Sequence, residues 1–130
     1  MRRLLMISLV SVLPSAASHA QGLHAVRPLP GYICMQLVLT PQQLTDPNSG
    51  VPVRLSPSRS APSAGFAATN VIVEDPPRAT AGFLRVLRPN GEYGWIEARQ
   101  LQPWSNPSAP AARCVPSVMS NGKPGFGSGS

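Results

Sequence analysis

The sequence predicts a small all-β domain, a barrel or a sandwich of short strands, and two observations support this prediction. The chain has 16 prolines, and all but Pro14 follow residue 20 and are spread along the rest of the chain. Long helices are disfavoured, because an interior proline removes a backbone donor and clashes with the preceding turn. Five short runs of β-branched, aromatic and aliphatic residues are separated by Pro, Gly, Ser and Asn, a pattern typical of small β folds.

In chain order, the five expected strands are YICMQLVL (32–39), VPVRL (51–55), NVIVE (70–74), GFLRVLR (82–88) and EYGWIEA (92–98). One short helix is expected at 41–46, with Thr40 as N-cap and Pro41 at the first helical position. The last two strands are expected to be antiparallel neighbours. Between them, Asn90 and Gly91 are residues that tolerate the positive φ of a tight hairpin.

Residues 1–20 are predicted to be a signal peptide, because Arg2 and Arg3 precede an apolar run (4–13) that is followed by small residues. The run is about half of the roughly 20 residues that a membrane-spanning helix needs. We therefore expect cleavage after Ala20, a periplasmic or secreted product, and no stable membrane insertion afterwards.

The remaining chain divides by composition into three parts. Residues 21–30 are expected to be a flexible leader, and residues 31–104 the folded domain. Residues 105–130 form a Pro/Gly/Ser-rich tail, held at Cys114 and expected to be disordered beyond Val115.

Cys34 and Cys114 are predicted to form a disulfide, the default for two cysteines in an oxidising compartment. The alternative, a reactive thiol, would need a histidine partner, and His24 in the leader is the only histidine after residue 20. A bridge that closes a loop of roughly 80 residues contributes on the order of 4 kcal/mol in the chain-entropy model.

The chain is basic, with a net charge of +6, but its charges are dispersed. Without Arg2 and Arg3, nine Lys and Arg stand against five Asp and Glu, a net charge of +4. A nucleic-acid surface needs a clustered basic stripe. Since the arginines are scattered singly, we expect a solvated basic surface and no nucleic-acid partner. A weak attraction of this surface to anionic wall polymers or lipid headgroups is an alternative that the charge also allows. The arginines between residues 31 and 104 are Arg54, Arg59, Arg78, Arg85, Arg88 and Arg99.

Between Val51 and Leu101 the motifs VPVRLSPSRSAPSAGF, NVIVE, GFLRV, NG, GWI and RQL follow one another in a fixed order. In that order they resemble a bacterial Src-homology-3-like domain, over about 50 residues. The resemblance implies a five-stranded, partly open barrel, here with an extra N-terminal strand and a disulfide. It also implies an exported binding or targeting module with an envelope or peptidoglycan function.

Eukaryotic relatives bind proline-rich peptides through an aromatic groove. The groove's tryptophan, proline and tyrosine match Phe83, Glu97 and Gln100 of this chain. Two of the three residues that build the groove are therefore replaced by polar ones, which disfavours a proline-rich ligand.

Strand alternation predicts which side chains of the last hairpin face outward. If Ile96 faces the core, so do Gly94, Leu84 and Val86, and the opposite face presents the candidate ligand-binding residues Phe83, Arg85, Tyr93 and Trp95. Alternatively, the leader, the strand at 32–39 or the tail covers this face. We expect one of these segments to cover Trp95, and the sequence makes no prediction for the exposure of Tyr93.

No catalytic residue, cofactor or metal site is predicted. Glu74 and Asp75 are adjacent acids whose side chains would point apart on a strand, and His24 has no partner at ligand or catalytic spacing. The sequence thus predicts a non-enzymatic module that recognises an envelope component, either a cell-wall peptide or a partner protein. The alternative is a small secreted inhibitor or stabilising accessory subunit that acts through its loops and tails.

Overall fold

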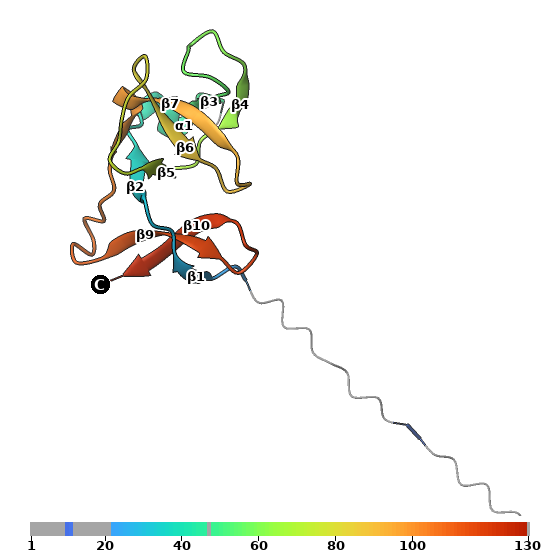
Figure 1. Cartoon of the computed structure of the whole chain (residues 1–130). Helices are drawn as coiled ribbons and strands as arrows, with labels where there is room; N and C mark the ends of the chain where they lie inside the picture. Colours follow the sequence, from blue (N-terminus) through green and yellow to red (C-terminus); the bar gives the residue numbers. More distant parts are fainter. Residues whose placement is uncertain (1–9, 12–21, 47, 130) are drawn as a thin grey trace, which may run out of the picture.

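The computed structural model describes residues 10–11, 22–46 and 48–129. Except for Val10 and Ser11, the predicted signal peptide lies outside the described residues. The fold consists of two antiparallel sheets (Figure 1). The smaller sheet has the order β1 (Ala25–Pro28), β9 (Arg113–Met119), β10 (Pro124–Gly129). The larger has the order β4 (Ser63–Phe66), β3 (Pro52–Arg54), β7 (Tyr93–Glu97), β6 (Phe83–Leu87), β5 (Asn70–Glu74), β2 (Tyr32–Leu37), β8 (Leu101–Pro103).

The predicted all-β class is confirmed, and each of the five predicted strands occurs with slightly shorter or equal bounds, as β2, β3, β5, β6 and β7. Two strands of the larger sheet were not predicted. β4 has the sequence SAGF, and β8 has only three residues and ends in proline. Neither carries a strong strand pattern, so their conformation depends on pairing with β3 and β2.

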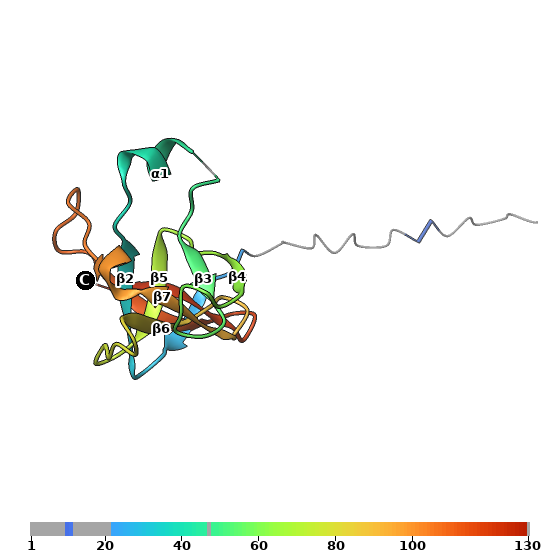
Figure 2. The same cartoon turned by 90° about the horizontal axis from the view of Figure 1, so that it is seen from above.

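The predicted helix is confirmed as α1 (Pro41–Thr45). The hydroxyl of Thr40 accepts a hydrogen bond from the backbone of Gln43, and the Gln43 side chain accepts one from the backbone of Thr40. This reciprocal pair is a capping box, which satisfies two backbone donors that a helix start leaves free. The helix buries none of its residues and projects away from the sheets in Figure 2.

The β6–β7 hairpin is confirmed, and its turn is longer than a two-residue one. The backbone N–H of Arg88 donates to Glu92 O and that of Gly91 donates to Arg88 O, both at 2.8 Å. The loop therefore has three residues, and only Gly91 has a positive φ, of 86°. Pro89 explains the difference: a two-residue loop would need its missing backbone N–H, whereas its fixed φ suits the second position of a type I turn.

The core of the larger sheet lies on its concave side. Val53 from β3 and Leu101 from β8, near opposite ends of the strand order, belong to one buried cluster, so the sheet is strongly curved. Gly94 lies at the closest approach of β7 to β3, where a Cβ atom would be 2.3 Å from Val53 Cγ1. The other members of the cluster are Met35, Leu37, Val51, Val71, Val73, Leu84, Val86 and Ile96.

The two chain ends differ from expectation, because the leader contains β1 and the tail contains β9 and β10. The turn between β9 and β10 repeats the one at 88–92. Met119 N donates to Lys123 O and Gly122 N to Met119 O, both at 2.8 Å. Asn121 Oδ1 accepts from Lys123 N, just as Asn90 Oδ1 accepts from Glu92 N. β9 also pairs with β1, so the strand of the leader has its partner in the tail.

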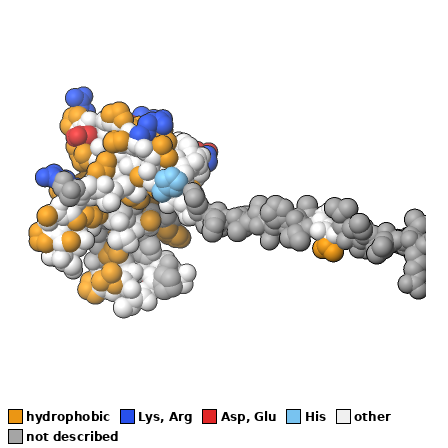
Figure 3. Space-filling view, turned by 90° about the horizontal axis from the view of Figure 1, so that it is seen from below, with side chains coloured by type: hydrophobic (Ala, Val, Ile, Leu, Met, Phe, Trp, Pro, Cys, Tyr) orange, Lys and Arg blue, Asp and Glu red, His pale blue; other side chains and the backbone are white. Residues whose placement is uncertain are grey.

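The smaller sheet lies below the larger one in Figure 1, where β9 is in contact with β2. The predicted disulfide is confirmed: Cys34 on β2 is bonded to Cys114 on β9, and their Cα atoms are 6.1 Å apart. Ile72 and Leu87 are buried although they lie outside the core cluster, and they line a small cavity together with Phe126 of β10. Seen from below, the molecule presents hydrophobic and uncharged side chains together with several Lys and Arg side chains and one His (Figure 3).

Candidate binding surface on the outer face of β6 and β7

The register of β6 and β7 confirms the predicted alternation. Leu84 is paired with Ile96 and Val86 with Gly94, and all four residues are buried. The other face of these two strands carries the alternate pairs, which are Phe83–Glu97, Arg85–Trp95 and Leu87–Tyr93. The four candidate residues Phe83, Arg85, Tyr93 and Trp95 therefore share one face, but they have different surroundings.

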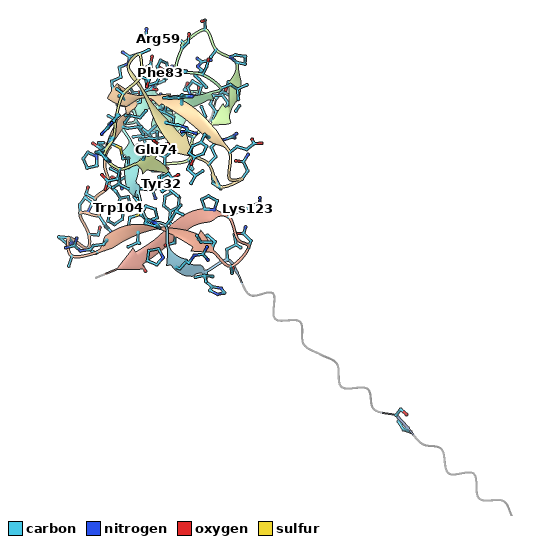
Figure 4. The ribbon with its side chains drawn as sticks, in the orientation of Figure 1. Tyr32, Arg59, Glu74, Phe83, Trp104 and Lys123 are labelled. Carbon is cyan, nitrogen blue, oxygen red and sulfur yellow. A yellow bond between two sulfur atoms is a disulfide. The ribbon has the colours of Figure 1, made fainter. Side chains whose placement is uncertain are left out.

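At one end of this face, near the smaller sheet, Tyr93 belongs to a polar cluster. The Arg85 guanidinium lies over the Tyr93 ring, 3.7 Å from its centroid, and donates to Glu74 Oε1 at 3.0 Å. The hydroxyl groups of Tyr93 and Tyr32 are hydrogen-bonded to each other. This hydrogen bond, with burial as a second cause, raises the pKa of Tyr32 to about 12. Figure 4 shows Tyr32 and Glu74 near the junction of the two sheets.

The exposure of the two aromatic residues on β7 differs. Tyr93 is 39% exposed, so its ring edge is accessible although its hydroxyl group is hydrogen-bonded within the protein. Trp95 is half-buried at the centre of the face, in register with Arg85 on β6 and Arg54 on β3.

Phe83 lies at the opposite end of the face, remote from the smaller sheet (Figure 4). It is only 6% exposed, so its outward position on the strand does not make it a free surface residue. It lines two adjoining cavities, of about 260 Å³ and about 720 Å³. The three positions matched to the aromatic groove, Phe83, Glu97 and Gln100, all line the smaller cavity.

The rim of the smaller cavity carries charge. The Glu97 carboxylate accepts hydrogen bonds from Nε of Arg59 and from Nε of Arg99, the second at 3.0 Å. Its side chain is 15% exposed, whereas those of Arg59 and Arg99 are 70% and 71% exposed. The hydrogen bond from Arg59 is the main reason that the pKa of Glu97 is lowered, so this carboxylate stays ionised at neutral pH.

Arg59 and Arg99 were not among the candidate residues predicted from the sequence. Arg59 lies in the segment between β3 and β4, and Arg99 lies in the 3-10 turn η1 (Ala98–Gln100). Alternation predicts facing only within strands, so it says nothing about either position. One feature of the sequence could have indicated them. Glu97 matches an apolar position of the groove, and a partly buried carboxylate usually has a cationic partner.

A larger cavity, of about 830 Å³, lies beside the disulfide. Tyr32 and Trp104 line it together with several prolines of the segment 103–116. The Gln36 side chain holds this segment at both polar atoms: its amide nitrogen donates to Ser105 O at 2.8 Å, and its oxygen accepts from Ser105 N at 3.3 Å. The sequence pattern did not mark this region.

Comparisons of the chain with protein-family models, with curated proteins and with solved structures find no match. Within the described ranges, no group of three or more His, Cys, Asp or Glu side chains is placed to hold a metal ion. None of the described helices has the length and apolar character needed to cross a membrane. The chemistry of the surface itself therefore has to carry a functional conclusion.

Proposed function

We propose that this protein is an exported, non-enzymatic binding module that recognises a component of the cell envelope through the outer face of β6 and β7. The observation that carries the proposal is the cavity at Phe83. Phe83 and Pro52 give it apolar contact surface, and its other five lining residues are polar or charged, so it could hold a small ligand that has both an apolar and a charged group. Its lining also includes Phe83, Glu97 and Gln100, the three residues that the sequence resemblance matches to a peptide-binding groove.

A Src-homology-3-like architecture is part of this proposal. The motifs between Val51 and Leu101 support it by their order, and so does the strong curvature of a sheet whose end strands share one core. The buried Gly94, at the contact of β7 with β3, gives the Gly-Trp-Ile motif an architectural role. In this proposal β2, the smaller sheet and the disulfide are additions to the family pattern.

Export is proposed from two independent features. Residues 1–20 have the charged, apolar and small-residue order of a signal peptide. The Cys34–Cys114 disulfide is consistent with an oxidising compartment outside the cytoplasm. A periplasmic or secreted location would bring the module to cell-wall peptides and envelope proteins.

The chemistry of the cavity favours a peptide or protein ligand that is not proline-rich. Stacked prolines need flat aromatic walls, and here Glu97 and Gln100 occupy two of the three wall positions. Nucleic acid is disfavoured because the arginines of this face do not form a continuous stripe: Arg85 is paired with Glu74, and Arg59 with Glu97.

The test is binding of the purified protein to isolated cell walls in a pull-down assay. We expect Tyr93→Ala, Trp95→Ala and Phe83→Leu to weaken binding. Leucine at 83 keeps an apolar filler at a buried position, where alanine would leave a void. Phe66→Ala is the matched control, because it removes an exposed ring on β4. Full binding by the triple variant, folded by circular dichroism, would refute the role of this face.

The alternative, a secreted inhibitor or stabilising accessory subunit, is favoured by one observation. The cavity of about 830 Å³ is lined by β2 and the segment 103–116, and by no residue of β6 or β7. Trp104→Ala separates the two functions: loss of binding to a captured partner in this variant, with wall binding intact, would support the accessory role.

A further inference from the structure

Arg59 and Arg99 keep donor capacity that the protein does not use. Each uses only its Nε atom to hold Glu97. Among the described residues, no other group forms a hydrogen bond with the terminal nitrogens of either guanidinium, and both side chains are largely exposed. A guanidinium presents donors in a planar fork that matches a carboxylate. Glu97 therefore orients two forks whose outer edges remain open to solvent.

The charge around the cavity is unbalanced. Arg54, Arg59 and Arg99 line it with a single acid, Glu97. Arg54 donates to Ala61 O at 3.2 Å, so its guanidinium is fixed near the cavity. Three cations and one anion leave a net positive charge at a site with a buried apolar floor, which attracts an anion.

The same geometry restricts the type of anion. Phe83 and Pro52 offer apolar contact directly beside the two arginines. An anionic polymer would need the cationic surface to continue along the face, but the next arginine, Arg85, is engaged by Glu74 and Tyr93. A single carboxylate attached to a small apolar group fits both the charge and the floor.

We propose that Arg59 and Arg99 bind the free α-carboxylate of a short peptide whose terminal side chain packs on Phe83. Peptides of this chemistry include uncrosslinked stem peptides of the cell wall, which end in alanine. The inference rests on the proposed function, since it specifies which part of an envelope peptide the face recognises. Glu97 acts as a positioning residue, because each of its two carboxylate oxygens accepts a hydrogen bond from one of the two guanidinium groups beside the same cavity.

The experiment is a nuclear magnetic resonance titration of the whole exported chain with N-acetyl-D-alanyl-D-alanine, as the free acid and as the C-terminal amide. We expect the acid to shift the backbone amides of Arg59, Phe83 and Arg99. The amide should bind at least ~10-fold more weakly, the order of effect for losing a charge-assisted bidentate contact. Arg59→Gln combined with Arg99→Gln should lose the acid response, whereas Arg27→Gln, at an exposed site on β1, should keep it.

Two results would overturn the inference. One is equal affinity for the acid and the amide; the other is an equal response to inorganic phosphate at the same concentration, which would mark an unselective anion site. The double arginine variant is also tested for wall binding. If wall binding depends on Tyr93 and Trp95 while the acid and the amide behave alike, the carboxylate inference fails and the proposed function stands. If the variants of the β6–β7 face all bind walls normally, the proposed function fails.

Discussion

Gly94→Ala is expected to destabilise the fold by forcing β3 and β7 apart. Gly94 is buried on the core face of β7, and a Cβ atom there would lie 2.3 Å from Val53 Cγ1 and 3.4 Å from Arg54 O. Side-chain atoms do not approach so closely, and Val53 is only 3% exposed, so it has little room to move. One of the two strands must shift, or Val53 must leave its preferred rotamer.

The expected cost follows from overpacking in a close-packed core, which is typically about 1–3 kcal/mol for one added methyl group. For a domain of this size, that corresponds to a fall in melting temperature of about 5–20 °C. In urea denaturation the midpoint should fall by roughly 1 M with little change in slope, because the surface exposed on unfolding is nearly the same.

Two further variants make the prediction specific. Gly22→Ala is the control, since a Cβ atom at that position would meet no atom within 4 Å. Val53→Ala alone should cost about 2 kcal/mol for its lost methyl groups. Combined with Gly94→Ala, it makes room for the new methyl group, so the double variant should be more stable than the sum of the single effects predicts. A Gly94→Ala protein as stable as the parent, or strictly additive costs, would refute the reasoning.

Three more predictions concern the disulfide, the tyrosine pair and the helix cap. Replacing Cys34 and Cys114 by serine opens a cross-link with a sequence separation of 80 and should cost about 4 kcal/mol; a melting temperature unchanged by the double substitution would contradict this. In Tyr93→Phe, absorbance titration should show the pKa of Tyr32 returning from about 12 toward its ordinary value of 10.0, because the hydrogen bond to Tyr93 is the largest cause of the shift. Since the shift is upward, this pair stabilises the parent fully below pH 10 and progressively less as pH rises to about 12; a Tyr32 that still titrates near 12 in the variant would contradict that cause. Thr40→Ala removes the capping box of a helix that buries nothing, so hydrogen exchange should speed up at Gln43 and Leu44 while the melting temperature stays unchanged; global destabilisation would show that α1 supports the core.

Local patterns in the sequence were sufficient for the central strands. The alternation of Leu84, Val86 and Ile96 identified the core face of β6 and β7, and the run NVIVE matched β5 residue for residue. The helix was predicted from its cap alone. In these elements the intrinsic secondary-structure preference and the period of the apolar residues agree with the final fold, so local sequence was enough to predict them.

The smaller sheet was not predicted, because the composition of the tail is typical of a flexible chain although its Asn-Gly pair is typical of a hairpin. PGFGSG has no β-branched residue, and a Gly- and Ser-rich stretch usually indicates a flexible chain. The Asn121–Gly122 pair carried the same hairpin signal as Asn90–Gly91, and in the structure both make the same backbone hydrogen bonds. β1 could not be found locally, since its partner β9 lies at the other end of the chain.

The candidate site could be predicted only in part, for a similar reason. Alternation placed Phe83, Arg85, Tyr93 and Trp95 on one face. It could not show that Phe83 is buried under neighbouring segments or that Arg59 reaches Glu97, 38 positions away in sequence. Contacts made by loops depend on the closed path of the chain, and no periodic pattern records them.

The pairing of β1 with β9 also sets the order in which the protein can fold. Pro28 is paired with Ser117 and Ala25 with Met119, so β1 cannot begin to pair with β9 until residue 117 is available for folding. The strands of the larger sheet span residues 32–103 and are all available earlier. Contacts between distant residues form slowly because the intervening loop must first close. Until then, Ile72 and Leu87 lack the cover of the hairpin that carries Phe126, and the half-folded chain exposes an apolar surface that the finished protein hides.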